Sequence, residues 1–341
     1  MNAFIEVSEH DEQRIAVKGR EYCAGSNHEE MPPSIPMANG IALTPRQANA
    51  TPAEAAQLCR VEIDARLPAT GSVLFRSLPL RNREDFNGFV NALGYPNHSY
   101  HGGIAVRPRS AGASLPASNE DERISMAPHN EMAYLPNFPK KIFFFCETAA
   151  AQGGEVPIND IRKSVEHIPD SVLNRFAATG ILYRRYLPKV SSAIEIGWQE
   201  TFGLSSADTI EAAMKAKGYD FGWHDDEGLS YSYVHSAFID DPRGGRPLWF
   251  NQVTELHASY WRNHPLFPSN RGDSRYPATT AYGDGEPIDT GLVSTLRAAL
   301  WKTARAVALK PGDVLVLDNT YIQHGRFAYS GIRSHFVSMT A

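Results

Sequence analysis

The sequence is poor in cysteine and has no long apolar run. It has three cysteines in 341 residues, Cys23, Cys59 and Cys146, and no Cys-x-x-Cys pair. A sparse, odd set of this kind argues against a disulfide framework and predicts reduced thiols in a cytoplasmic protein. No apolar stretch reaches the length of a bilayer span, and the N-terminus lacks the basic and apolar regions of a secretory signal. We therefore expect no membrane partner.

An excess of positive charge is also missing. The chain has 33 Lys and Arg against 38 Asp and Glu, a formal net charge of -5, so a nucleic-acid partner is not expected. No glycine-rich phosphate loop joins a strand to a helix, which argues against a doubly wound nucleotide-binding sheet. With 42% hydrophobic and 21% charged residues, the composition is that of a globular protein with a large core.

The chain divides into a short lead-in and one domain. Residues 1–50 are polar and rich in turn-forming residues, so we expect a loosely structured segment with at most one early strand. From Thr51 onward, helix and strand signals follow one another without a linker or repeat, and residues 51–341 predict a single domain. Helices are predicted in five segments, 51–67, 82–94, 169–180, 206–218 and 291–309.

Strands dominate the rest of the chain. "KIFFFCETA" is a continuous apolar run, typical of a strand buried on both faces, whereas "LSYSYVHSAFI" alternates as a half-buried strand does. Further strands are predicted near "GSVLFRSLPL", "GGEVPINDI", "GILYRRYLP", "VLVLDN" and "RSHFVSMTA". The predicted fold class is α+β, mainly β, built on a β-sandwich or barrel; alternating strands and helices leave a doubly wound sheet as the alternative.

A His-x-Glu pair in "APHNEMAYLPNFP" is the first half of a metal site. Alternate residues of an extended segment point to one side, so His129 and Glu131 can approach one ion together. Three other pairs have the same spacing, His10–Glu12, His28–Glu30 and His224–Asp226. Only His129–Glu131 lies directly before the most buried predicted strand, and His224–Asp226 is kept as the second choice.

A distant histidine completes the set. His324 follows the strand "VLVLDN", and two imidazoles with one carboxylate form a facial set for non-haem Fe(II) that leaves three positions open. Arg333 lies nine residues after His324, and an arginine there can grip a carboxylate with two hydrogen bonds. The pattern points to an Fe(II)- and 2-oxoglutarate-dependent oxygenase.

The chain also resembles a known family over roughly residues 70–341. The motifs "HNEMAY", "KIFFFCETAAAQGGEVPINDIR", "LWFNQ", "AYGDGEPI", "GDVLVLDNTYIQHGR" and "SGIRSHFV" are together similar to those of taurine dioxygenase/clavaminate synthase-like enzymes. Within that family the resemblance is greatest to the branch of syringomycin-type amino-acid hydroxylases.

The resemblance implies a double-stranded β-helix (jelly-roll) core with flanking helices. It implies that His129, Glu131 and His324 bind Fe(II), and that Arg333 binds the distal carboxylate of 2-oxoglutarate, with O2 as second co-substrate. One position departs from the pattern: many relatives have a threonine that contacts the co-substrate where this chain has Val156. Glu131 argues against halogenation, because related halogenases replace this carboxylate by a small residue.

The predicted reaction is hydroxylation of an unactivated C–H, with release of succinate and CO2. The substrate class implied by the resemblance is a free amino acid, an aminoacyl thioester on a carrier protein, or a related small intermediate. Candidate substrate contacts, chosen because they flank the metal motifs, are Tyr134, Asn251, Gln252 and Arg326. Desaturation, epoxidation or cyclisation with the same cofactors, a metal-dependent hydrolase and a binding protein on this fold remain as alternatives, and the oligomeric state is left open.

Overall fold

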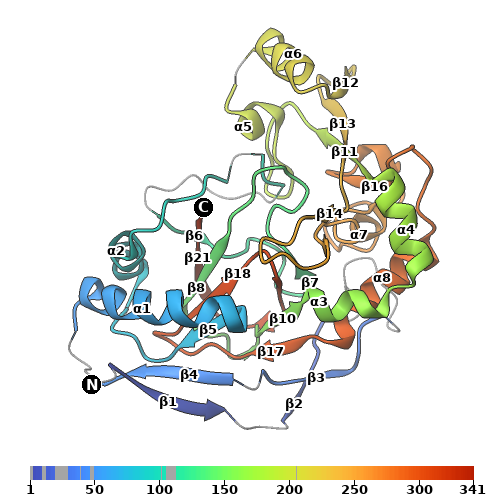
Figure 1. The fold of residues 1–341 in the computed structure, drawn as a ribbon. Coiled ribbons are helices and arrows are strands. Elements are labelled where there is room, and N and C mark those ends of the chain that lie inside the picture. The colour runs from blue at the N-terminus through green and yellow to red at the C-terminus, as the bar shows by residue number, and fades with distance from the viewer. Residues whose placement is uncertain are drawn as a thin grey trace.

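Two β-sheets packed face to face form the centre of the molecule. The computed structural model describes residues 3–9, 13–19, 30–38, 40–46, 50–100, 102–104, 113–204 and 206–341. Helices cover the outer face of the larger sheet, and a third sheet rises above this body at the top of Figure 1. The protein is therefore α+β and mainly β.

The larger sheet has seven strands and is almost entirely antiparallel. Only its β4–β5 pair is parallel. In spatial order the strands are β1 (Phe4–Glu9), β4 (Gly40–Pro45), β5 (Ser72–Phe75), β18 (Val314–Asp318), β8 (Lys141–Thr148), β21 (Ser334–Thr340) and β6 (Leu115–Pro116). Strands from both ends of the chain thus meet in one sheet.

The central strand β8 is buried on both faces, as its apolar sequence predicts. Phe143 and Phe145 point to one side and pack in the cluster that contains the two long N-terminal helices. Ile142, Phe144 and Cys146 point to the other side and pack against the smaller sheet. Because side chains alternate along a strand, this run serves two hydrophobic layers.

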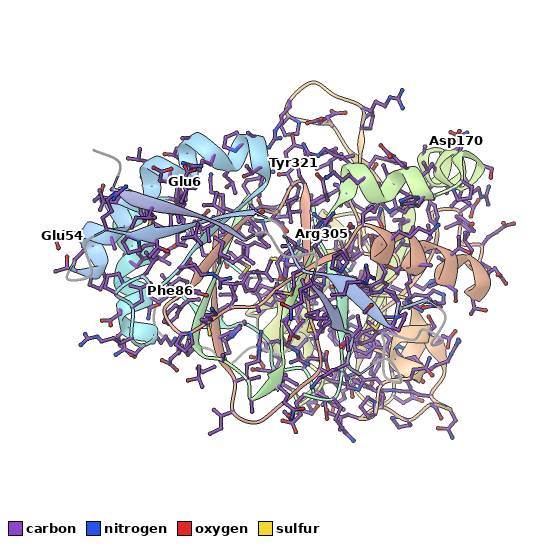
Figure 2. All side chains as sticks on the ribbon, turned by 90° about the horizontal axis from the view of Figure 1, so that it is seen from below. Glu6, Glu54, Phe86, Asp170, Arg305 and Tyr321 are labelled. Atoms are coloured by element: carbon purple, nitrogen blue, oxygen red, sulfur yellow. The ribbon has the colours of Figure 1, made fainter. Side chains whose placement is uncertain are left out.

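Two capped helices form the outer layer. Helix α1 (Pro52–Thr70) begins with the predicted capping box. The Thr51 side chain accepts a hydrogen bond from the Glu54 main-chain N–H, and the Glu54 side chain accepts one from the Thr51 N–H. Helix α2 (Arg83–Leu93) is capped by Asn82 and ends at Gly94, also as predicted. Figure 2, seen from below, shows Glu6 on β1, Glu54 and Phe86 at this end of the molecule and Asp170 at the other.

The smaller sheet positions the candidate metal site. Its strands are, in order, β17 (Arg305–Val307), β10 (Val156–Asp160), β19 (Ile322–Arg326) and β7 (Met126–His129). All its pairs are antiparallel, and His324 on β19 lies opposite His129 on β7 in the register. Side chains from β10, β17 and β19 share a hydrophobic cluster with the larger sheet, so the site lies against a rigid core.

The third sheet and its helices belong to another hydrophobic cluster. The sheet consists of β12 (Asp220–Trp223), β13 (Leu229–His235), β11 (Ile181–Leu187) and β16 (Thr279–Tyr282). The helices that accompany it are α4 (Asp170–Thr179), α5 (Trp198–Phe202), α6 (Ala207–Ala216), α7 (Ala258–Arg262) and α8 (Thr290–Lys302). Burial in β13 alternates from Leu229 to Tyr233, which confirms the predicted half-buried strand.

Short elements complete the described chain. Two-stranded pairs are formed by β2 (Arg14–Ala16) with β3 (Ser34–Pro36), β14 (Phe238–Ile239) with β15 (Leu248–Trp249), and β20 (Tyr329–Ser330) with β9 (Gln152–Gly153). The remaining helical turns are α3 (Ile161–Ser164) and two 3-10 turns at Val165–His167 and Asp273–Arg275. None of the helices in the described part of the chain combines the length and apolarity that a bilayer crossing needs.

Two expectations differ from the structure. The helix predicted over 291–309 ends at Lys302, because Arg305–Val307 leaves the helix to pair with β10 as an edge strand. The described part of residues 1–50 contains four strands instead of one at most, and β1 and β4 extend the seven-stranded sheet. The strand β4 joins β5, which lies beyond helix α1, and β1 pairs with β4, so the local polarity of the segment misled the prediction.

Candidate active site

Three side chains, two from adjacent strands and one from the turn after β7, converge at the smaller sheet. His129 is the last residue of β7, Glu131 follows two residues later, and His324 lies on β19. All three are buried, and their ligand atoms lie within 4.8 Å of one another. No other cluster of three or more potential ligands occurs within the described ranges. The structure thus brings together the residues that the spacing predicted.

The imidazoles are oriented for metal binding. His129 Nδ1–H donates to the Ala127 carbonyl at 2.9 Å, which leaves the Nε2 lone pair available. His324 Nε2 lies 3.6 Å from Glu131 Oε2, and the Phe144 ring packs on the His324 ring at 4.9 Å. Burial and the neighbouring His324 lower the pKa of His129, which favours the neutral imidazole that a metal requires. Two neutral nitrogens and one carboxylate oxygen match the preferences of Fe(II).

A buried asparagine holds the Glu131 main chain. Asn319 Oδ1 accepts from Glu131 N at 2.8 Å, and Asn319 Nδ2 donates to the carbonyls of Glu131 and Pro139 at 3.1 and 2.8 Å. In return, Asn130 Nδ2 donates to the Asn319 carbonyl at 2.6 Å. Met132, directly after the carboxylate, has a φ of 57°, an unfavourable conformation for a side chain of its size. The hydrogen bonds of Asn319 therefore stabilise the turn after β7, in which Met132 has an unfavourable backbone conformation.

Arg333 lies close to the triad, in a small cavity that the triad also lines. It lines a cavity of about 30 Å³ together with His324, Phe144 and Val156. Its Nε donates to the Gly154 carbonyl at 3.3 Å, and no carboxylate in the described part of the chain pairs with it. Burial lowers its pKa to about 10, so the guanidinium keeps its charge near neutral pH. A partly buried cation of this kind is suited to an anionic ligand.

Val156 faces the same small cavity. It is 2% exposed and lies at the start of β10. Its isopropyl group offers no hydrogen bond to a ligand beside Arg333. The departure from the threonine of many relatives is therefore located where a co-substrate contact is expected.

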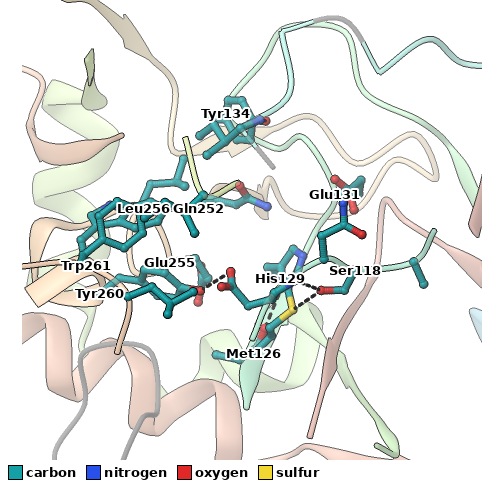
Figure 3. Close-up of a pocket in the computed structure, with 18 of the residues that line it drawn as sticks. Ser118, Met126, His129, Glu131, Tyr134, Gln252, Glu255, Leu256, Tyr260 and Trp261 are labelled. Carbon is teal, nitrogen blue, oxygen red and sulfur yellow. Dashed lines mark hydrogen bonds between the residues drawn. The ribbon is translucent and has the colours of Figure 1, made fainter. Parts of the chain in front are cut away.

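A larger cavity of about 150 Å³ is also lined by His129 and Glu131. Tyr134 and Gln252, both predicted as substrate contacts, line it (Figure 3). Their polar atoms have partners already: the Tyr134 hydroxyl accepts from Ile104 N at 2.9 Å. Gln252 Nε2 donates to the Asn130 carbonyl at 2.7 Å.

Asn251, another predicted contact, lies away from the described lining of that cavity. Its Nδ2 donates to the Ala237 carbonyl at 3.0 Å, and its Oδ1 accepts from Val253 N at 3.1 Å. Both bonds hold the loop after β15.

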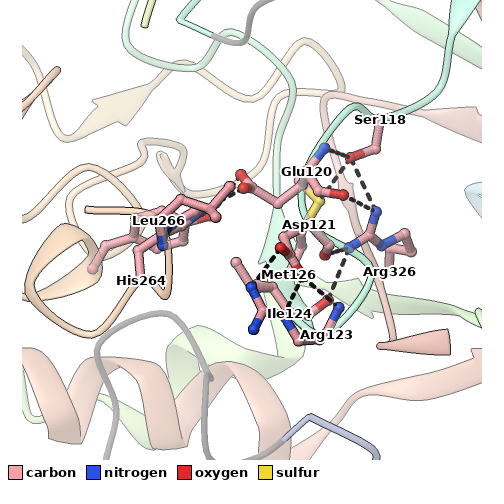
Figure 4. A network of polar contacts seen from close by, with 10 residues as sticks. Ser118, Glu120, Asp121, Arg123, Ile124, Met126, His264, Leu266 and Arg326 are labelled. Atoms are coloured by element: carbon pink, nitrogen blue, oxygen red, sulfur yellow. Dashed lines mark hydrogen bonds and ion pairs between the residues drawn. The ribbon is translucent and has the colours of Figure 1, made fainter. Parts of the chain in front are cut away.

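The guanidinium of Arg326 is directed at a neighbouring segment. NH1 donates to the Glu120 carbonyl at 2.9 Å and to Ser118 Oγ at 3.4 Å. NH2 donates to the carbonyls of Asp121 and Ile124 at 2.6 and 2.9 Å (Figure 4). Arg326 is 3% exposed, and both terminal nitrogens are engaged. The geometry favours the support of this segment over contact with a substrate.

Two carboxylates in the larger cavity were not predicted. Glu120 and Glu255 line it together with His129. Neither belongs to a metal-like spacing, and each lies in an irregular connection, so motif reading gave no reason to select it. The one available signal for Glu255 was an acidic residue beside the apolar residues Val253 and Leu256.

The alternative His-x-Asp pair lies elsewhere. His224 and Asp226 occupy the turn between β12 and β13, where His224 Nε2 contacts Ser230 Oγ at 2.6 Å and Asp226 accepts from Tyr186 at 2.8 Å. No third ligand joins them among the described residues. His10, Glu12 and His28 lie outside the described residues.

Comparisons with known proteins give matches over most of the chain. A family model described as taurine catabolism dioxygenase TauD, TfdA family, matches residues 39–340. The dapdiamide synthesis protein DdaC of Enterobacter agglomerans is 29% identical over 282 residues, covering 81% of this chain and 84% of that protein. A clavaminate synthase-like protein of Arabidopsis thaliana is 30% identical over 285 residues, covering 81% and 83%. The crystal structure of PvcB from Pseudomonas aeruginosa covers 100% of this chain and 94% of its own, at 13% identity and a TM-score of 0.48.

Proposed function

Because this chain belongs to the taurine catabolism dioxygenase TauD/TfdA family and is an Fe(II)- and 2-oxoglutarate-dependent oxygenase, we propose that it hydroxylates an unactivated C–H of an amino-acid-like substrate. The observation that carries the proposal is the convergence of His129, Glu131 and His324 between two cavities. One cavity contains a buried guanidinium and the other suits a group of amino-acid size.

In this proposal, His129, Glu131 and His324 hold the iron. When bound, Fe(II) with 2-oxoglutarate and O2 supplies the oxidation that converts C–H to C–OH, with release of succinate and CO2. The chain supplies orientation: Ala127 fixes the His129 ring, and Asn319 fixes the Glu131 main chain. Partners of this kind maintain ligand geometry and affinity.

Arg333 binds the distal carboxylate of 2-oxoglutarate in the small cavity. Its position beside His324, its charge and the missing carboxylate partner support this role. The apolar surfaces of Phe144 and Val156 lie along the same cavity and exclude water from the ion pair. Exclusion of water strengthens each electrostatic contact there.

We infer that the two facing sheets are the halves of a double-stranded β-helix. The shared hydrophobic cluster and the location of the triad at one end of the smaller sheet support this. The parallel pairing of β4 with β5 further supports residues 1–50 and 51–341 acting as one folded unit.

The substrate is a free or carrier-tethered amino acid or a related small intermediate. The cavity volume of about 150 Å³ can accept a group of amino-acid size. The role of the Enterobacter agglomerans relative in dapdiamide synthesis supports a biosynthetic reaction. We infer that Arg326 supports the cavity wall, because its terminal nitrogens already have acceptors.

An anaerobic titration tests the cofactor assignment. Metal-free protein, loaded with Fe(II) and 2-oxoglutarate, should develop the visible charge-transfer band of the chelate. The band should be lost in Glu131→Ala and should need far more 2-oxoglutarate in Arg333→Ala. Asp226→Ala, which removes the carboxylate of the other His-x-Asp pair, is the matched control and should behave as the parent. A folded, metal-binding parent without the band would contradict the proposal.

A further inference from the structure

The larger cavity has an unusual balance of charge for an enzyme of amino acids. The charged side chains on its wall, apart from His129, are Glu120, Glu131 and Glu255. No lysine or arginine lies among the described residues that line it. Glu131 belongs to the metal triad, which leaves two further carboxylates facing the substrate. Along the described part of this wall, an amino acid with a free carboxylate would meet acidic side chains and no lysine or arginine.

The first of these carboxylates is held by the protein. His264 Nε2 lies 2.5 Å from Glu120 Oε1, and the Tyr260 hydroxyl donates to Glu120 Oε2 at 2.9 Å. Burial opposes the charge of Glu120, yet these contacts keep its pKa below the ordinary value. Glu120 therefore adds a fixed negative charge to the wall, with both oxygens already engaged.

The second carboxylate, that of Glu255, has fewer side-chain hydrogen bonds than that of Glu120. Glu255 accepts a hydrogen bond from Thr254 Oγ1 at 2.7 Å, and burial raises its pKa. The charged groups that influence it are His129 and Arg297. Arg297 is 1% exposed and uses its NH2 on the Thr254 carbonyl and Ser259 Oγ, and it does not belong to the described lining of the cavity. The cavity side of Glu255 thus faces the substrate space.

Burial raises the pKa of Glu255 although Arg297 and His129 act in the opposite direction, so a ligand cation on the cavity side of this carboxylate would offset the remaining cost of desolvation. The neighbouring wall is formed by Leu256, Tyr260 and Trp261, whose apolar and aromatic surfaces also suit the carbon atoms beside an ammonium group. We propose that Glu255 selects substrates with a cationic nitrogen and without a free carboxylate, such as aminoacyl amides or thioesters. This inference rests on the proposed function and specifies its substrate class.

A charge series on one scaffold tests this selection. The probes are L-leucinamide, N-acetyl-L-leucinamide and N-acetyl-L-leucine, which carry a positive, zero and negative charge, and the same three derivatives of asparagine. Each is titrated anaerobically into protein loaded with Fe(II) and 2-oxoglutarate, and the perturbation of the charge-transfer band gives a Kd. Succinate release after admission of O2 is the second readout.

In the parent, the cationic amides should bind about ten-fold or more tightly than their neutral counterparts, with the anions weakest. Glu255→Gln should remove this preference by weakening the cations about ten-fold while changing the neutral probes less than about two-fold. Glu255→Asp, which keeps the charge, should restore part of the preference. Glu166→Gln removes an exposed carboxylate from the surface and should match the parent.

The outcomes separate this inference from the cofactor assignment. If the band forms but neutral or anionic probes bind as well as the cations, Glu255 does not select charge. The same holds if Glu255→Gln weakens all probes equally, or if no probe perturbs the band at about 10 mM. Loss of the band in the parent would instead contradict the proposed function. The band without probe also reports whether each variant is folded and loaded.

Discussion

The metal end and the substrate wall of the site are built in different ways. At the metal end, His129 and His324 are register partners on adjacent strands, and Asn319 ties the Glu131 main chain to the turn after β18. The substrate wall comes from irregular connections, where Glu120 and Glu255 depend on side-chain contacts. The metal ligands lie on or next to the β7–β19 ladder. The side chains that we propose to recognise the substrate lie on irregular segments, which can change in sequence without altering that ladder.

The difference extends to how each end tolerates change. In the β7–β19 ladder, β19 lies between β10 and β7 and is paired on both sides, while the edge strand β7 is paired with β19, so the sheet positions both histidines. A residue in the wall is positioned by a few polar contacts, such as those that Arg326 makes to the segment of Glu120. Perturbation at the metal end should therefore affect iron, and perturbation of the wall should affect the substrate first.

The largest effect that would test this contrast comes from Asn319→Ala. The substitution leaves the Glu131 N–H and the carbonyls of Glu131 and Pro139 without their partner. We expect Fe(II) affinity and turnover to fall about 10- to 100-fold. The free energy of unfolding should fall by about 1–3 kcal/mol. Anaerobic iron titration and urea unfolding measure the two effects separately.

Asn251→Ala is the matched control for that experiment. Asn251 is also buried and also bonds main-chain groups, but these are the Ala237 carbonyl before β14 and the Val253 N–H after β15. A comparable loss of stability with unchanged iron affinity is expected. Equal losses of iron affinity in both variants would show that Asn319 does not stabilise the iron ligands specifically.

A smaller effect on iron binding, at the boundary between the two regions, is expected for Arg326→Met. It keeps a similar apolar stem and removes the donors to three carbonyls of the wall segment. The free energy of unfolding should fall by about 3 kcal/mol. KM for the amino-acid substrate should rise more than KM for 2-oxoglutarate, because the wall segment moves while Arg333 stays.

Arg326→Lys distinguishes support from direct charge recognition. Lysine keeps the charge but cannot reach the same acceptors as a planar guanidinium, so we expect stability to remain low. If lysine restored both stability and substrate binding, the charge of Arg326 would itself contact the substrate.

The same contrast explains what could be read from the sequence. His129, Glu131 and His324 were selected because their spacing and the flanking buried strands are visible along the chain, and the structure brings them together. Glu255 and Asn319 were missed, because their importance depends on a cavity wall and a turn whose parts are far apart in sequence. Within residues 1–50, β4 was missed for the same reason, since it finds its partner β5 after the intervening helix α1, and β1 pairs in turn with β4.

The smallest effect tests the one departure within the co-substrate cavity. Val156→Thr is nearly isosteric and adds a hydroxyl beside Arg333, so KM for 2-oxoglutarate should fall about two- to five-fold if the carboxylate accepts a hydrogen bond there. The buried hydroxyl should cost about 1 kcal/mol in unfolding free energy without ligand, and saturating 2-oxoglutarate should recover it. Val307→Thr, on the strand that pairs with Val156, should lower the unfolding free energy similarly without lowering KM for 2-oxoglutarate. An unchanged or higher KM in Val156→Thr would mean that Arg333 and the main chain already satisfy the co-substrate, and that the metal end tolerates variation more readily than its ladder implies.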